Sequence, residues 1–127
     1  MLKPILSIAM FALSVVPAAA KPILPFSTAA LRAALARGAP ILVDVFAPWC
    51  PTCRAQAPTI DAIAASPAYE KLTILRLDFD HQVAEKKALG VNQQSTLIVF
   101  KGGKEVGRTL GVTQPDQIRA FAALPLK

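Results

Sequence analysis

The chain has 127 residues, enough for one domain, and its 14 Lys and Arg against 8 Asp and Glu make it moderately basic. The basic residues form no run of five or more, and no aromatic residues alternate with them. This scatter argues against nucleic-acid binding and against a polybasic membrane patch.

The first 20 residues have the pattern of an export signal. Lys3 supplies a positive charge, residues 5–16 are mostly apolar, and Ala18-Ala19-Ala20 ends the segment with small residues that a signal peptidase accepts. An uncleaved anchor is the alternative, but a bilayer span needs about 20 apolar residues. We expect a signal peptide over residues 1–20 and a mature domain over residues 21–127.

The mature chain begins with alternating extended and helical patterns. Residues 21–26 contain two prolines and form at most a short edge strand. Ser27 is a suitable N-cap for a helix that Gly38 ends. Residues 41–46 are an apolar, partly β-branched run interrupted only by Asp44, which predicts a strand buried on both faces at the centre of a sheet.

The rest of the chain continues this alternation. Residues 52–65 have a helical pattern, which Pro58 should kink. Strands that alternate with helices and end in a hairpin indicate an α/β domain with a mixed sheet. The remaining expected elements are a strand at 72–77, a short helix at 83–89, a strand at 96–100, a Gly102-Gly103 turn, a strand at 106–110, and a helix at 118–124 preceded by a Thr113–Asp116 capping box.

Cys50 and Cys53 are the only cysteines and lie in the segment FAPWCPTC. A structural zinc site needs about four Cys or His ligands, and His81 is the only histidine. A disulfide between the two would close a very short loop, so it would restrict the unfolded chain little. The pair is therefore expected to serve redox chemistry rather than stability.

The positions of the two cysteines predict different roles. Cys50 stands where a helix begins, and the free N–H groups and dipole of the helix favour a thiolate there. Cys53 lies one turn further in and should be more shielded, so that it keeps its proton. In disulfide exchange an exposed thiolate attacks first and a second thiol resolves the mixed disulfide. We therefore assign Cys50 as the nucleophile and Cys53 as the resolving thiol of a redox-active disulfide.

Two segments resemble the thioredoxin family. Residues 41–53, ILVDVFAPWCPTC, resemble its central strand and active-site turn, and residues 96–103, TLIVFKGG, resemble its third-strand hairpin. Pro58 matches its kink proline and Gly111 matches a glycine near its site. The similarity extends roughly from residue 26 to the end of the chain. It implies a thioredoxin-like α/β fold, with a mixed sheet of four to five strands flanked by helices, and dithiol–disulfide exchange without metal or cofactor.

The resemblance also implies further site residues. Asp44 matches a buried acid beneath the resolving cysteine, where desolvation should raise its pKa and let it take or give that thiol's proton. An acid that reaches water at a strand end is the alternative. Trp49 matches a tryptophan beside the nucleophile, either a contact surface for partners or a packed aromatic. Gln94, Ser95 and Gly111 are expected to complete the substrate-binding surface.

Three features depart from the family pattern, the first being an initial strand that Pro22 and Pro25 truncate. Phe46 stands where relatives usually have tryptophan. Ser95 stands where relatives have a cis-proline, and because a cis bond before serine costs about 2.5–4 kcal/mol, the Gln94–Ser95 bond is expected to be trans. Pro51 and Thr52 match neither the common reductase pair nor the usual strong-oxidant pair, which leaves the direction of electron flow open.

The expected function is that of a periplasmic thiol–disulfide oxidoreductase, favoured as a reductase or electron carrier over an oxidant. It should be a monomer that acts on protein thiols and disulfides and binds no nucleic acid. Because the periplasm is oxidising, a reductase there needs a membrane thiol relay as electron donor. The alternative is a dimeric binding module in which the altered Ser95 site lets two chains share a metal or cluster through four cysteines.

Overall fold

The computed structural model describes residues 2, 4, 11–15 and 21–127. The predicted signal peptide falls largely on residues outside this described part. Within it, no helix combines the length and the apolar character that a membrane crossing requires.

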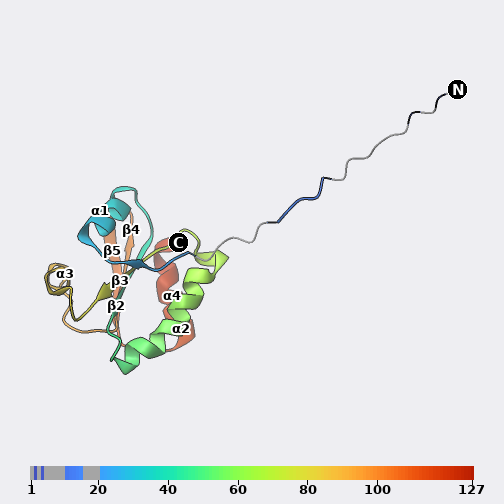
Figure 1. Ribbon diagram of the computed structural model, residues 1–127. Helices are drawn as coiled ribbons and strands as arrows, with labels where there is room; N and C mark the ends of the chain where they lie inside the picture. The colour runs from blue at the N-terminus through green and yellow to red at the C-terminus, as the bar shows by residue number, and fades with distance from the viewer. Residues whose placement is uncertain (1, 3, 5–10, 16–20) are drawn as a thin grey trace.

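Five strands form one mixed sheet in the order β1-β3-β2-β4-β5 (Figure 1). β1, β3 and β2 are parallel neighbours, whereas β4 is antiparallel to both β2 and β5. β2 is central, as its apolar run predicts, and the expected mixed α/β sheet is confirmed with five strands. The strands are β1 Leu24–Pro25, β2 Ile41–Phe46, β3 Thr73–Asp78, β4 Thr96–Lys101 and β5 Lys104–Leu110.

Helices cover both faces of the sheet. α2 and α4 lie on one side of the sheet, and α1 and α3 lie on the other (Figure 1). An apolar cluster fills each side, one with Val43 and Val45 of β2 and the other with Leu42 of the same strand. The helices are α1 Thr28–Ala36, α2 Pro51–Ala65, α3 Val83–Leu89 and α4 Pro115–Ala123, and short 3-10 turns occupy Pro67–Tyr69 and Leu124–Leu126.

Local signals account for most helix ends. Ser27 caps α1, since its Oγ accepts a hydrogen bond from the Ala30 N–H at 3.0 Å. The predicted capping box before α4 is wrong: the N-cap is Gln114, which makes no side-chain cap bond, and the helix begins at Pro115. Proline is pre-organised for the first helical position, so α4 starts three residues before the expected Ile118.

The alternation of side chains along β2 places the acid of that strand. Successive residues of a strand point to opposite faces, so Asp44 shares the face of Leu42, which packs against α2 and α4. β2 ends at Phe46, and α2 begins at Pro51 only a few residues later. The end of β2 and the start of α2 therefore bring Asp44 and the two cysteines into one region.

Candidate active site

Both cysteines lie at the N-terminus of α2 as free thiols. Cys50 is the N-cap residue, and its Sγ accepts a hydrogen bond from the Cys53 backbone N–H at 3.1 Å. The Sγ of Cys53 instead donates to the Val45 carbonyl at 3.8 Å. The two sulfurs therefore have opposite hydrogen-bonding roles.

The exposure of Cys50 differs from the prediction. Cys50 is 2% exposed and Cys53 is 1% exposed, so the expectation of an exposed nucleophile is wrong. Both pack with Ala47 in a small cluster that Phe46 and Phe79 border. This packing buries Cys50, since Ser27 caps α1 with the same kind of side-chain bond and is exposed.

Cys53 keeps its proton, as predicted. Burial raises the pKa of the Cys53 thiol to about 11, and the hydrogen bond with the Cys50 side chain acts in the same direction. Backbone hydrogen bonding from Ala47 and Ser95 opposes the rise. At neutral pH the second cysteine is therefore a thiol that must lose its proton before it can attack.

Asp44 is buried and paired with an arginine. It is 1% exposed, so the alternative of an acid that reaches water is wrong. Arg76 lies directly opposite on β3, and its Nε donates to Oδ2 of Asp44 at 2.8 Å. Desolvation raises the pKa of Asp44, and the Arg76 guanidinium only partly offsets this. The other oxygen, Oδ1, is buried without a hydrogen-bond partner among the described residues.

Arg76 was missed by the sequence analysis, although the pairing of two predicted strands was a signal that could have located it. Its guanidinium carbon lies 4.7 Å from the centre of the Phe46 ring, so the ring that replaces tryptophan carries a cation over its face. Arg76 also lines a cavity of about 310 Å³. This cavity connects solvent with the cation that holds the buried carboxylate. Its other lining residues are Phe46, Pro48, Asp78, Asp80 and His81.

Trp49 is both exposed and anchored. It is 54% exposed, and its Nε1 donates to the Asp80 carboxylate at 2.8 Å. Its ring meets Phe79 edge-on at 6.4 Å. An exposed ring held in one orientation is suited to contact a partner, so the two alternatives for Trp49 both describe part of its setting.

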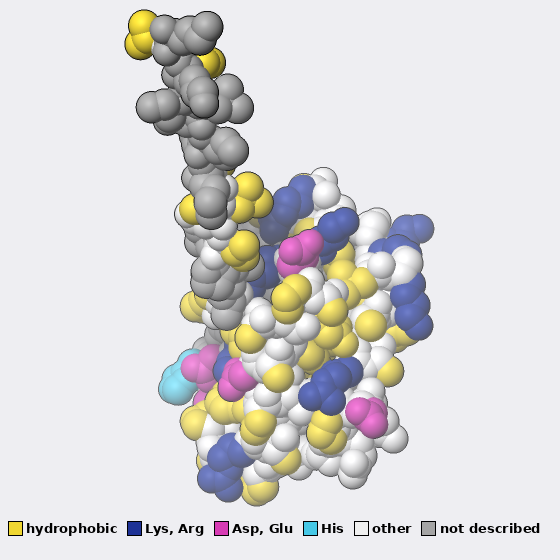
Figure 2. Space-filling model, turned by 90° about the vertical axis from the view of Figure 1, so that its right-hand side faces the viewer, with side chains coloured by type: hydrophobic (Ala, Val, Ile, Leu, Met, Phe, Trp, Pro, Cys, Tyr) yellow, Lys and Arg dark blue, Asp and Glu magenta, His cyan; other side chains and the backbone are white. Residues whose placement is uncertain are grey.

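The loop whose Asp80 binds the Trp49 side chain also contains His81, the only histidine of the chain. The side chain of His81 is 82% exposed, and its Nδ1 lies 2.8 Å from Oδ2 of Asp78. This hydrogen bond lowers the pKa of Asp78. In Figure 2 the histidine lies beside acidic side chains at one edge of the face, while the Lys and Arg side chains are spread over the rest.

Ser95 lies in a turn next to the cysteines. No peptide bond of the described residues is cis, so the Gln94–Ser95 bond is trans as predicted, and Ser95 has a φ of 61°. Its N–H donates to the Val45 carbonyl at 2.9 Å, and its carbonyl accepts the Gly111 N–H at 3.1 Å. Of the predicted substrate-binding residues, the structure thus joins Ser95 and Gly111, with Gln94 half-buried in the same turn.

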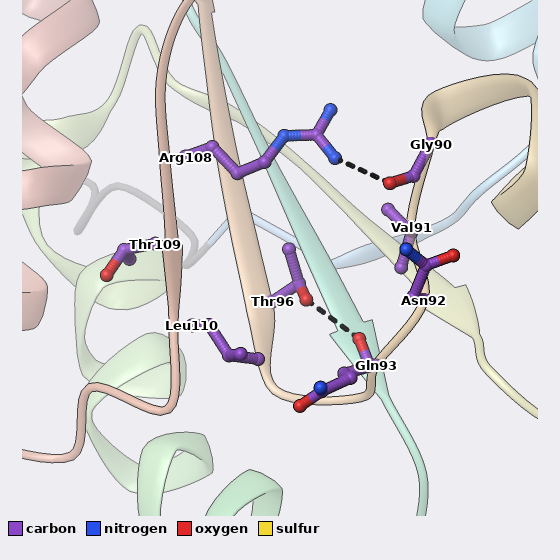
Figure 3. A pocket seen from close by; sticks show the side chains of 8 residues that line it. All are labelled: Gly90, Val91, Asn92, Gln93, Thr96, Arg108, Thr109 and Leu110. Atoms are coloured by element: carbon purple, nitrogen blue, oxygen red, sulfur yellow. Dashed lines mark hydrogen bonds between the residues drawn. The ribbon is translucent and has the colours of Figure 1, made fainter.

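A cavity of about 260 Å³ lies beside the Ser95 turn (Figure 3). Thr96 closes the turn by donating from Oγ1 to the Gln93 carbonyl at 2.7 Å. Arg108 reaches across from β5 to the Gly90 carbonyl at 3.2 Å (Figure 3). The lining residues are Gly90, Val91, Asn92, Gln93, Thr96, Arg108, Thr109 and Leu110.

Gln56 is a second residue that the sequence analysis missed. It lies on α2 and is fully buried. Its Nε2 donates to the Val112 carbonyl at 2.8 Å and to the Ser95 carbonyl at 3.3 Å. Its spacing of four and seven residues from the inward-facing Ile60 and Ile63 was the available signal, because residues at that spacing share a helix face.

The thioredoxin family model matches residues 23–123, most of the chain. The chain belongs to the thioredoxin family. It is 42% identical over 78 residues to the thioredoxin of Chlamydia muridarum, which spans 61% of this chain and 74% of that protein. It is 36% identical over 84 residues to the thioredoxin of Alicyclobacillus acidocaldarius, spanning 66% of this chain and 79% of the relative.

Solved structures agree with this assignment. Trxlp from Edwardsiella tarda EIB202 has a TM-score of 0.77 and 42% identity, over 80% of this chain and 98% of that chain. The resemblance inferred from the segments around Cys50 and Thr96 is confirmed, as is thiol–disulfide oxidoreductase activity on protein disulfides. Among the described residues, no three His, Cys, Asp or Glu side chains are grouped to hold a metal ion, and nothing there favours the metal-sharing dimer.

Proposed function

We propose that this thioredoxin-family protein is an exported, periplasmic oxidoreductase that reduces protein disulfides or carries electrons to them. The observation that carries the assignment of roles is the asymmetry of the two sulfurs. Cys50 Sγ accepts the Cys53 N–H at the start of α2, whereas Cys53 Sγ donates to the Val45 carbonyl and has a raised pKa. Cys50 is therefore the nucleophile and Cys53 the resolving cysteine.

The reaction moves two electrons in two exchanges. The Cys50 thiolate attacks one sulfur of a substrate disulfide, a new S–S bond joins Cys50 to the substrate, and the other substrate sulfur leaves as a thiolate. Cys53 then loses its proton and attacks Cys50 Sγ. The substrate sulfur that was bonded to Cys50 leaves and is protonated, and the Cys50–Cys53 disulfide remains.

Asp44 is assigned the proton of Cys53. It lies on the face of β2 that packs against α2, and it directly precedes Val45, whose carbonyl accepts the Cys53 thiol. A carboxylate whose pKa is raised by desolvation takes up a proton more readily than an ordinary one. With no direct bond between the two groups among the described contacts, we assign the transfer to a bridging water.

The substrate is expected to bind on the surface around the two cysteines, which are themselves buried. Trp49 offers an exposed apolar face, and Ser95, which is bonded to Gly111, shares the Val45 carbonyl with Cys53; Gln94 lies in the same turn. The reducing direction is supported by the similarity to proteins named thioredoxin, whose reduction potential is typically about −270 mV. The reduced form would be restored by a membrane thiol relay, and the protein would act as a monomer.

Trapping and potential measurements test the roles and the direction. Cys53→Ala should accumulate mixed disulfides with protein substrates through Cys50, and Cys50→Ala should accumulate none. Equilibration with glutathione should give a reduction potential near the value of about −270 mV typical of thioredoxin, rather than about −120 mV as in strong oxidants. Equal trapping by both variants would refute the roles, and a potential near the oxidant value would refute the direction.

The export proposal rests on Lys3, the apolar residues 5–16 and the Ala18-Ala19-Ala20 end. Intact-mass analysis of the protein from fractionated Gram-negative cells should find a chain that starts at Lys21 in the periplasmic fraction. A chain that retains its first residues in the membrane fraction would contradict it.

A further inference from the structure

Gln56 is a buried amide that joins three segments of the active site. It lies on α2, one turn after Cys53, and its Nε2 reaches the carbonyls of Ser95 and Val112. Ser95 directly precedes β4, and Val112 follows Gly111 after the end of β5. One side chain therefore fixes the helix that carries both cysteines to the two loops that border them.

The backbone of Ser95 needs such support. Ser95 is the only non-glycine residue of the described chain with a positive φ, at 61°. This left-handed conformation is unfavourable for a residue with a Cβ and persists only where surrounding contacts enforce it. Three hydrogen bonds do so here: Ser95 N–H to Val45, Gly111 N–H to the Ser95 carbonyl, and Gln56 Nε2 to the same carbonyl.

The position held in this way lies against the resolving cysteine. The Val45 carbonyl that accepts the Ser95 N–H also accepts the Cys53 thiol. A change in the Ser95 backbone would alter both bonds. The orientation of the amide is fixed as well, because a flipped Gln56 would turn Oε1 toward two carbonyl oxygens.

A buried amide at this position is not explained by packing alone. An apolar side chain of similar volume would fill the same space without a desolvation penalty. Gln56 is fully buried, and its Oε1 has no partner among the described residues. The amide therefore carries an unsatisfied acceptor in exchange for the two bonds that its Nε2 makes.

We propose that Gln56 is a positioning residue that holds Ser95 in its left-handed conformation and thereby aligns the resolving step of Cys53. This inference rests on the proposed roles of Cys50 and Cys53. Gln56 is fully buried and acts through the Ser95 turn rather than on the substrate.

Gln56→Met tests the proposal, because methionine keeps the length of the side chain and removes the donor. The attack of Cys50, followed with a disulfide substrate under single-turnover conditions, should stay within about twofold of the parent rate. The resolution of the mixed disulfide should slow by about tenfold or more. Amide hydrogen exchange of Ser95 and Gly111 should accelerate together with this loss.

Thr59→Val is the matched control, since Thr59 is a buried polar residue of the same helix, one turn further on. It should leave resolution and the exchange of both amides as in the parent. Slow resolution in the control to the same extent would show that any buried polar loss in α2 has this effect, and would overturn the proposal.

Ser95→Gly supplies the rescue, because glycine adopts a positive φ without strain. In this background the added Gln56→Met should slow resolution by less than about twofold relative to Ser95→Gly alone. This comparison also serves if Gln56→Met by itself does not fold. A tenfold loss that persists in the Ser95→Gly background, or parent-like resolution in Gln56→Met, would overturn the positioning role. A parent protein that forms no mixed disulfide through Cys50 would instead overturn the proposed function.

Discussion

Asp44 combines two opposing demands at the level of a single residue. It must be ionised to accept a proton, yet its surroundings disfavour the ionised form, since desolvation raises its pKa despite the Arg76 guanidinium at 2.8 Å. Proton uptake therefore needs the ionised form of Asp44, whereas the stability of the fold is lowered by that form because it is buried. A buried acid with this conflict is typical of a functional site.

Asp44→Asn should stabilise the fold at neutral pH and slow the resolution of mixed disulfides. The folded state binds the Asp44 proton more tightly than the unfolded state does. Its contribution to stability is thus fully present below the ordinary pKa of 3.8 and is lost as the pH rises through the raised value. Urea unfolding at pH 7 should show a gain in unfolding free energy over the parent, and this gain should shrink as the pH falls toward 3.8.

Asp61→Asn is the control for this gain. Asp61 lies near the same arginine, 3.9 Å from Arg76 Nη2, but its side chain is 64% exposed. Removing its charge should change the unfolding free energy by less than about 0.5 kcal/mol. If both variants gain stability equally, burial of Asp44 is not the cause.

Ser95→Pro should destabilise the protein rather than restore a typical thioredoxin site. Proline fixes φ near −65° and lacks an N–H, whereas residue 95 has a φ of 61° and donates to the Val45 carbonyl. The substitution should lower the unfolding free energy by about 2–4 kcal/mol unless the whole turn rearranges. Chemical denaturation measures this, and Ser95→Ala, which keeps the N–H, should lose less than about 1 kcal/mol. Equal losses in both variants would contradict the backbone argument.

At the level of elements, β5 and α4 pack without space for a side chain at Gly107. A Cβ there would lie 3.1 Å from a ring carbon of Phe121 and 3.1 Å from a methyl of Val99. Val99 is fully buried and Phe121 packs partly buried against the same core, so a methyl group at residue 107 would have to displace them by a few tenths of an ångström. The glycine is thus required for its size, unlike Gly102 and Gly103, which have positive φ in the hairpin turn.

Gly107→Ala should consequently lower the unfolding free energy by about 1–3 kcal/mol. Thermal and urea unfolding would measure the loss. Val106→Ala is a suitable comparison on the same strand, since Val106 is 47% exposed, and it should lose less than about 1 kcal/mol. A parent-like Gly107→Ala variant would show that α4 can shift to admit the methyl group.

The elements also show which features local sequence could predict. The continuous apolar run of β2 identified the central strand, and Gly90, with a φ of 65°, ends α3 at the predicted residue. These signals act within a few residues of one another. β5 begins two residues before the expected Val106, and α4 begins three residues before the expected Ile118, because the pre-organised Pro115 took precedence over the expected cap at Thr113.

The interactions that build the site are of another kind. Arg76 meets Asp44 across 32 positions, and Gln56 meets Val112 across 56. Strand pairing and helix spacing were signals for Arg76 and Gln56, but their exact partners became visible only with the strands in register and α2 packed on the sheet. The burial of Cys50 had the same origin, since it depends on packing against Ala47 and the neighbouring aromatic rings rather than on residue type. Spacing located the reactive atoms, and tertiary contacts determined their surroundings.

At the level of the whole molecule, the described fold is built from residues 21–127. Every helix and strand among the described residues lies between Leu24 and Leu126. β1 is the edge strand beside β3. Leu24 pairs with Leu75, and the Phe26 N–H donates to the Arg76 carbonyl at 2.8 Å. Phe26 itself is 5% exposed and belongs to the core. Cleavage after Ala20, as the export proposal requires, would leave this edge intact.

A chain that starts at Lys21 should therefore unfold cooperatively and be more stable than one that starts at Ser27. Loss of Phe26 alone removes a buried aromatic ring, which corresponds to about 3 kcal/mol or more. The shorter chain also leaves the β3 edge unpaired beside Arg76, so exchange activity should fall together with stability. Urea unfolding of the two chains measures the difference. Leu24→Ala in the longer chain is the control, because Leu24 is 42% exposed and should contribute less than about 1 kcal/mol. Equal stability of the two chains would show that β1 adds nothing to the fold and that a cleavage site beyond Phe26 would be equally compatible with it.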